Sequence, residues 1–122
     1  MASMVHGYVH HDGHQAVHLR DRFAVTIPDI DWIEELRADE NEWLVFTSDL
    51  RISRNKAERE AFRRAGLRAF GFAKGYQKMP LHQRCASLIY RWPEVVGLLD
   101  TVSAPFMFEF PVGRRKKFRS LI

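Results

Sequence analysis

The chain has 122 residues, of which 46% are hydrophobic and 28% charged, so it fits one domain with enough apolar residues to bury a core. No apolar run reaches the roughly 20 residues that a membrane-spanning helix needs, and the start lacks the pattern of a signal peptide. The single cysteine, Cys85, excludes an intrachain disulfide. We therefore expect a cytoplasmic protein.

The net charge of +4 is concentrated at the C-terminal end. Residues 113–122 hold five basic residues and no acidic ones, whereas the rest of the chain carries 14 basic and 15 acidic residues. We predict that this basic tail contacts a phosphate backbone. The alternative is a solvated, frayed terminus. The basic side chains of the tail are Arg114, Arg115, Lys116, Lys117 and Arg119.

The first 27 residues are predicted to hold little regular structure. Residues 1–12 are rich in histidine and are expected to be irregular. Residues 15–19 alternate apolar and polar side chains and are a short strand candidate, and residues 20–27 read as a loop. The histidines have a helical spacing that suits Zn²⁺, but the turn signal Asp12-Gly13 would interrupt such a helix, so we do not favour a zinc site.

A helix is predicted from Pro28 to about Ala38. The fixed φ of proline suits the first turn of a helix, where its missing N–H has no intrahelical partner to lose. Asp29 and Asp31 fall in this first turn, where the helix dipole favours negative charge. The residues expected on the apolar face are Ile30, Ile33 and Leu36.

Residues 43–48 form a near-continuous apolar run, WLVFTS, which predicts a strand covered on both faces, as in a parallel sheet. This strand ends on a carboxylate, Asp49, and arginines follow at once. We consider this segment to be the chemical centre of the chain.

The second half of the chain is predicted to alternate helices and strands. Asn55 and Glu58 resemble a capping box that opens a helix, and Gly66 is a suitable end. Further elements are expected at residues 67–72 (strand), 81–92 (helix), 93–102 (helix) and 106–110 (strand). This alternation indicates a parallel α/β sheet, in which functional groups gather at the carboxyl ends of the strands.

Two sets of side chains are candidates for chemistry at that edge. Asp29, Asp31 and Asp49 are predicted to hold Mg²⁺ or Mn²⁺, because hard cations prefer oxygen ligands. The alternative is that these aspartates only cap a helix or begin a turn. Arg51 and Arg54 are placed to grip substrate phosphates, the alternative being a solvated loop.

Several short motifs occur in an order typical of one protein family. They are GHQAVHLRDRF at residues 13–23, PDIDWI at 28–33, TSDLRI at 47–52, RN at 54–55, ERE at 58–60, AGL at 65–67 and FEFPV at 108–112, followed by the basic end. In this succession the chain resembles the PIN-like domains related to VapC toxins, and more narrowly the VapC45-like group. The resemblance runs from about Gly13 to the C-terminus.

The resemblance implies a PIN-like three-layer α/β/α sandwich with a mainly parallel sheet over residues 13–112. It implies metal-dependent endoribonuclease activity, often as the toxin of a toxin–antitoxin pair, so RNA and an antitoxin protein are the expected partners. In the family's pattern one acidic residue lies in the first turn of the second helix, here Asp29 or Asp31. Another ends the following strand, here Asp49.

The chain departs from the family at its N-terminal end. The family opens with a strand that carries an Asp and then a helix, and only twelve residues stand before Gly13 here. Either the sequence starts downstream of the natural start, or the gene is truncated, or residues 5–9 substitute as a strand with Asp12 as a displaced carboxylate. We favour the first two explanations. A sheet without its central strand would leave apolar surface and unpaired backbone groups, so we expect association, such as a homodimer.

Three functions remain from the sequence. The leading hypothesis is a metal-dependent ribonuclease of the PIN and VapC type, inactive if the truncation is real. The alternative is a non-catalytic RNA- or protein-binding remnant of that fold. A small-ligand domain of flavodoxin type ranks last, because the sequence has no phosphate-binding loop.

Overall fold

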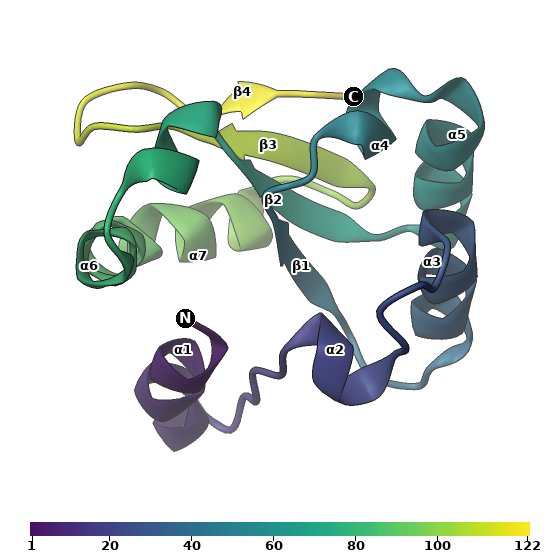
Figure 1. The fold of residues 1–122 in the computed structure, drawn as a ribbon, viewed down its shortest axis with the longest axis horizontal. Helices are drawn as coiled ribbons and strands as arrows, with labels where there is room; N and C mark the ends of the chain where they lie inside the picture. Colours follow the sequence, from purple (N-terminus) through teal and green to yellow (C-terminus); the bar gives the residue numbers. More distant parts are fainter.

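The computed structural model describes residues 1–122 and is built on one four-stranded sheet. The strands lie side by side in chain order and are β1 (Leu44–Thr47), β2 (Arg68–Phe72), β3 (Phe106–Phe110) and β4 (Arg119–Ser120). β1, β2 and β3 are parallel, and β4 is antiparallel to β3. The expected mainly parallel sheet is confirmed, and the carboxyl ends of β1, β2 and β3 therefore share one edge (Figure 1).

Helices cover both faces of this sheet. They are α1 (Ala2–Val9), α2 (Leu19–Arg22), α3 (Asp29–Ala38), α4 (Arg51–Arg54), α5 (Lys56–Ala65), α6 (Leu81–Tyr90) and α7 (Trp92–Thr101), with 3-10 turns at His10–Asp12 and Lys74–Lys78. Successive side chains of a strand point to opposite faces, so Phe70 packs with α1, α6 and α7, whereas Ala69 packs with α3, α4 and α5. The three-layer α/β/α sandwich is confirmed.

The predicted ends of α3 and α5 agree with the structure. Asn55 Oδ1 accepts a hydrogen bond from the backbone N–H of Glu58 at 3.1 Å, and Gly66 ends α5 with a left-handed φ of 66°. The apolar face of α3 differs by one position, because Ile30 is 41% exposed and Trp32 is buried in its place.

The N-terminal segment differs from the prediction. Residues 1–12, expected to be irregular, form α1 and a 3-10 turn, and Val5 and Val9 lie one turn apart in the core. Residues 5–9 are therefore not a substitute strand. Residues 15–19 are not a strand either, because no neighbouring strand pairs with them and His18 Nδ1 instead caps α2, accepting from the N–H of Arg20 at 3.1 Å.

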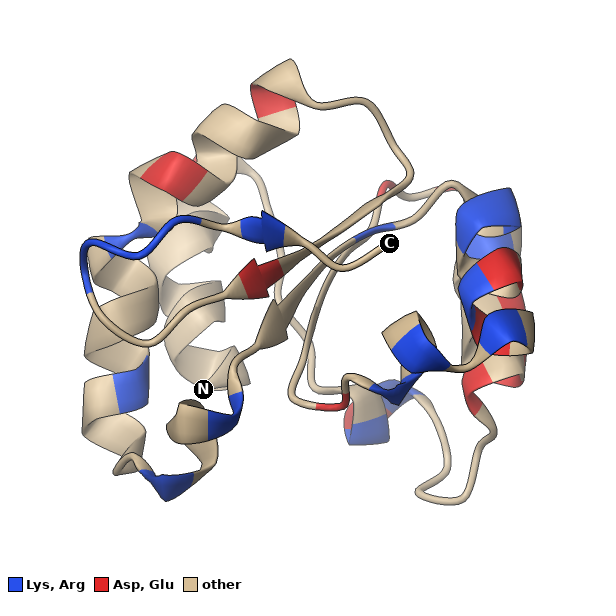
Figure 2. Ribbon diagram, turned by 90° about the horizontal axis from the view of Figure 1, so that it is seen from above, with Lys and Arg blue, Asp and Glu red and all other residues tan.

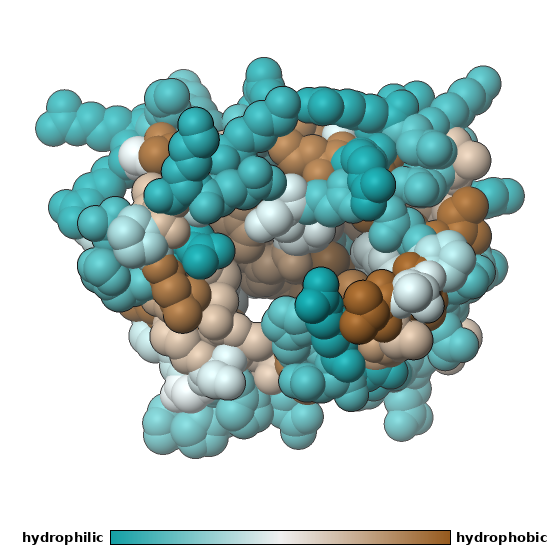
Figure 3. Space-filling view, viewed as in Figure 1, coloured by the Kyte–Doolittle hydropathy of each residue, from teal (hydrophilic) through white to brown (hydrophobic).

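β1 is the outermost strand on one side of the sheet and pairs only with β2. Its side chains reach the apolar core on both faces of the sheet, as predicted. Phe46 packs on the face covered by α1, α6 and α7, and Val45 packs on the face covered by α3, α4 and α5. All four of its residues are nevertheless only half-buried. The face of the molecule drawn in Figure 3 is hollowed at its centre, with apolar atoms at the bottom of the hollow. None of the helices has the length and apolar character needed to cross a membrane.

The basic tail is part of the folded domain. β4 pairs with β3, with Arg119 opposite Glu109. Phe118 packs against the core on the α6 and α7 face of the sheet, and Leu121 packs against the core on the α3 and α5 face. The frayed-terminus alternative is therefore wrong. The basic residues between β3 and β4 form a loop at one side of the sheet (Figure 2).

Candidate functional site

Asp49 lies directly after β1, at the carboxyl edge of the sheet. Its backbone N–H donates to Thr47 Oγ1 at 3.0 Å, and its Oδ1 accepts from the backbone N–H of Arg51 at 2.9 Å. The carboxylate therefore caps the turn that leads into α4. The turn lies close against β2 at Gly71, where a Cβ would come within 2.5 Å of Leu50 Cδ2.

Arg51 pairs with the same carboxylate through its side chain. Its Nε lies 2.9 Å from Asp49 Oδ1 and 3.0 Å from Oδ2, and its Nη2 lies 2.6 Å from Oδ2. These side-chain hydrogen bonds lower the pKa of Asp49, against the opposing effect of its partial burial. They also raise the pKa of Arg51, so both groups are charged at neutral pH.

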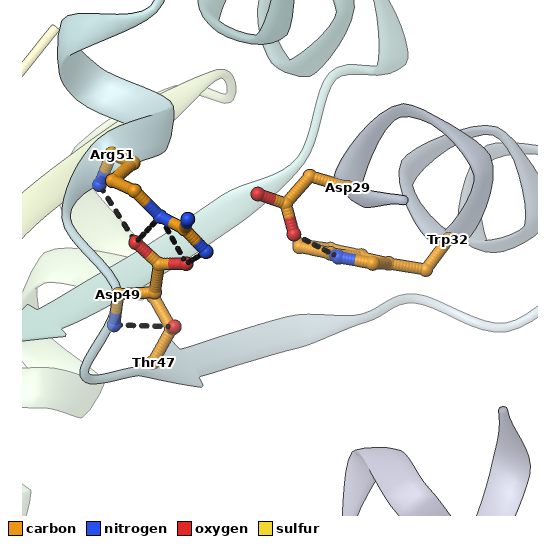
Figure 4. Close-up of polar contacts among 5 residues, drawn as sticks. All are labelled: Asp29, Trp32, Thr47, Asp49 and Arg51. Atoms are coloured by element: carbon orange, nitrogen blue, oxygen red, sulfur yellow. Dashed lines mark hydrogen bonds and ion pairs between the residues drawn. The ribbon is translucent and has the colours of Figure 1, made fainter. Parts of the chain in front are cut away.

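The carboxylate of Asp29 faces this ion pair from the start of α3 (Figure 4). Its Oδ1 accepts a hydrogen bond from Trp32 Nε1 at 2.9 Å, which fixes its orientation. Residues two apart on a helix do not share a face, so Asp31 points away from Asp29 and is exposed. Of the two predicted aspartates on this helix, the structure brings only Asp29 toward Asp49.

Glu58 is a fourth charged group at this place, and sequence reasoning missed its role. It lies in the first turn of α5, and its Oε2 is buried without a hydrogen-bond partner. Desolvation raises its pKa, and the negative charges of Asp29 and Asp49 raise it further. The capping-box pattern had identified this residue only as part of a helix start.

The carboxylates of Asp29, Asp49 and Glu58 are the candidate ligands for a cation at this end of the sheet. They offer only oxygen donors, which suits a hard cation, and Glu58 Oε2 lacks a partner. No three or more acidic, histidine or cysteine side chains are close enough together to hold a metal ion, so the predicted group of Asp29, Asp31 and Asp49 is not assembled. Asp29 and Glu58 fit a site with two carboxylates, the usual protein contribution to bound Mg²⁺.

The other basic residues that were predicted to contact phosphates also lie at the carboxyl end of the sheet. Arg54 is exposed at the end of α4, one turn beyond Arg51. The basic side chains of residues 114–117 are exposed on the loop that leaves the carboxyl end of β3. They start from the same edge of the sheet as Asp49 but belong to the half of the molecule built by α6 and α7.

Replacing Glu58 with Gln is expected to raise the melting temperature at pH 7. The pKa of this acid is raised on folding, so the native state binds more protons and loses stability as pH rises above the ordinary pKa of glutamate. The gain should therefore shrink toward pH 4, as Glu58 becomes protonated in the unfolded as well as the folded state. Thermal melts followed by circular dichroism between pH 4 and 8 measure it. Glu60→Gln removes the same charge two residues away, and an equal gain in both variants would contradict the assignment.

Comparison with known proteins shows which family the chain belongs to. A family model described as a PIN-like domain matches residues 1–74, which is more than half of the chain and includes Asp29, Asp49, Arg51 and Glu58. No curated protein and no solved structure gives a significant match. The basic loop lies outside the matched residues. The matched segment, together with the mainly parallel sheet flanked by helices, shows that the chain belongs to the PIN-like domain family.

Proposed function

We propose that the protein is a metal-dependent endoribonuclease that hydrolyses phosphodiester bonds at the carboxyl end of β1. The observation that carries this proposal is that Asp29 faces the Asp49–Arg51 pair at the carboxyl end of β1 in a PIN-like domain (Figure 4). The buried, unpaired carboxylate oxygen of Glu58 belongs to the same charged surroundings, because, beside desolvation, the negative charges of Asp29 and Asp49 raise its pKa. Such a rim combines carboxylates, which suit a divalent cation, with a guanidinium, which suits a phosphate.

Each residue has a distinct role in this proposal. Asp29 and Glu58 would hold Mg²⁺ or Mn²⁺, and the bound metal would supply an activated water and neutralise charge on the phosphate. Arg51 is 80% exposed, so it can leave Asp49 and bind a phosphate oxygen. Asp49 is then free to join the metal site or accept a proton. Arg54 would hold a neighbouring phosphate.

Cleavage of a labelled single-stranded RNA tests the proposal directly. Products should appear with Mg²⁺ or Mn²⁺ and disappear when EDTA is added. RNA that stays intact with every divalent cation, although the protein binds it, would instead favour the second candidate, a non-catalytic RNA-binding remnant. The complete pairing of Asp49 by Arg51 is the observation that favours this second function.

The narrower proposal is a toxin of the VapC45-like group with a cognate antitoxin. Its support is the succession of motifs from Gly13 onward together with the PIN-like match. Induced expression should then arrest growth, and the arrest should depend on Asp49. A homodimer, proposed because β1 is an unpaired edge, is tested by light scattering of the purified chain.

A further inference from the structure

Arg91 is the only charged residue in the buried core, at 3% exposure, and it takes no part in the site at Asp49. It lies at the junction of α6 and α7. Its Nε and Nη2 pair with both oxygens of Glu94, at 3.2 and 2.6 Å. Burying a guanidinium costs free energy unless its N–H groups have hydrogen-bond acceptors. The contacts of Arg91 beyond Glu94 are therefore the ones that show what this buried charge does.

Those remaining contacts are with the segment that joins β3 to β4. Arg91 Nη1 donates to the carbonyl oxygen of Gly113 at 3.2 Å, and the guanidinium carbon lies 4.5 Å from the centre of the Phe118 ring. Just before this loop, the buried Tyr76 hydroxyl donates to the carbonyl oxygen of Pro111 at 2.7 Å. One side chain, Arg91, thus holds both ends of the basic loop.

Between these two anchors stand four consecutive cations, Arg114, Arg115, Lys116 and Lys117, all exposed. Like charges in a row repel one another, so an unanchored segment of this kind would spread and lose any fixed shape. The loop instead borders a groove of about 610 Å³ against α7. Arg114 stacks at 4.3 Å on the ring of Tyr90, which is 56% exposed.

We propose that residues 113–118 form a preorganised loop that binds the phosphate backbone of single-stranded RNA, and that Arg91 is its positioning residue. Four cations in sequence match the repeated charge of a nucleic-acid backbone. The exposed Tyr90, on which Arg114 stacks, adds aromatic surface beside them of the kind that single-strand binders use. The loop leaves the same sheet edge as Asp49, so a bound strand can extend toward the site. This inference rests on the proposed function for its choice of ligand.

The test is RNA binding by fluorescence anisotropy with a labelled single-stranded 20-mer, in EDTA so that cleavage plays no part. Changing all four loop cations to Gln should flatten the dependence of log affinity on log salt by up to about 3, since each phosphate contact on a single strand contributes about 0.7. Arg91→Gln should weaken binding by about threefold to tenfold, although the buried Arg91 cannot touch RNA. Arg64→Gln, which removes one exposed charge from α5, is the matched control and should bind as the wild type does.

Two further measurements separate positioning from charge and from unfolding. Arg91→Lys keeps the charge but cannot make the same set of contacts, so it should also lose affinity. Trypsin should cut within residues 114–117 at least about tenfold faster in Arg91→Gln than in the wild type, because the loop is no longer held. Phe118→Leu keeps an apolar side chain and removes the stacking, which provides a second variant if Arg91→Gln does not fold.

The inference is overturned if folded Arg91→Gln, or Phe118→Leu in its place, retains both wild-type RNA affinity and slow loop cleavage. It is also overturned if the fourfold loop variant binds RNA with an unchanged salt dependence. Because binding is measured without metal, a protein that binds through the loop but never cleaves RNA would contradict the nuclease proposal and leave the loop assignment intact.

Discussion

Asp49→Asn is expected to reduce the rate of RNA cleavage by at least about 100-fold, the lower end of what a positioned proton-transfer group contributes. The substitution removes the negative charge that orients Arg51 and that, in the proposed mechanism, would serve the metal site or the reacting water. It changes neither the size of the side chain nor its place at the end of β1. The measurement is a time course of cleavage of a labelled single-stranded RNA with saturating Mg²⁺ or Mn²⁺.

The same variant should keep its fold. The Asp49–Arg51 pair lies at the surface, with 34% and 80% of the two side chains accessible, and ion pairs of this kind contribute little to stability because solvent screens them. Because the pKa of Asp49 is lowered on folding, its contribution is present above the pKa of the unfolded chain and is lost as pH falls through the folded value. Asp100→Asn, at an exposed position near the end of α7, removes an equal charge and should cleave normally. Equal rates for Asp49→Asn and the wild type would remove Asp49 from the mechanism.

Substitution of the two aspartates of α3 should have different effects on the cleavage rate in the same assay. Asp29 faces Arg51 and Glu58, so Asp29→Asn should lose cleavage to a similar degree. Asp31 points to the other side of the helix, so Asp31→Asn should have little effect. The reverse order of effects would show that the orientation of this helix turn is not the one used in catalysis.

Phe70→Ala is expected to reduce the free energy of unfolding by about 4 kcal/mol, the middle of the range for a large aromatic side chain removed from a core. Phe70 is fully buried in the centre of β2. Its ring centre lies 5.5 Å from that of Phe46, 5.8 Å from that of Phe106 and 5.6 Å from that of Phe118. Removing it leaves a cavity between three strands and the segment that follows the basic loop.

Urea unfolding followed by circular dichroism measures this loss. Leu81→Ala provides the control, because Leu81 is an equally apolar residue that is 51% exposed at the start of α6. It should cost under about 1 kcal/mol, as surface substitutions usually do. A loss for Phe70→Ala as small as that of the control would mean that the aromatic cluster is loosely packed and does not hold β1, β2 and β3 together.

Sequence alone identified most elements whose signals are local. The cap at Asn55, the glycine that ends α5, the start of α3 at Pro28 and the alternating phenylalanines of β3 each depend on contacts within a few residues. The position of Asp49 at the end of a strand could be predicted for the same reason. Local patterns did not predict the helix at residues 2–9, because α1 is stabilised by the sheet face on which Val5 and Val9 pack.

Only the tertiary structure decided which charged groups meet. Asp29, Asp49 and Glu58 begin or follow different elements, and the packing of α3 on α5 beside the end of β1 determines that Asp29 rather than Asp31 faces Arg51. Arg91 and Gly113 lie 22 positions apart in the chain, so no periodicity could have paired them. The basic tail shows the division most clearly. Its charge was evident from composition, but its shape depends on a buried guanidinium and on β4 pairing with β3, which are contacts that exist only once the chain has folded.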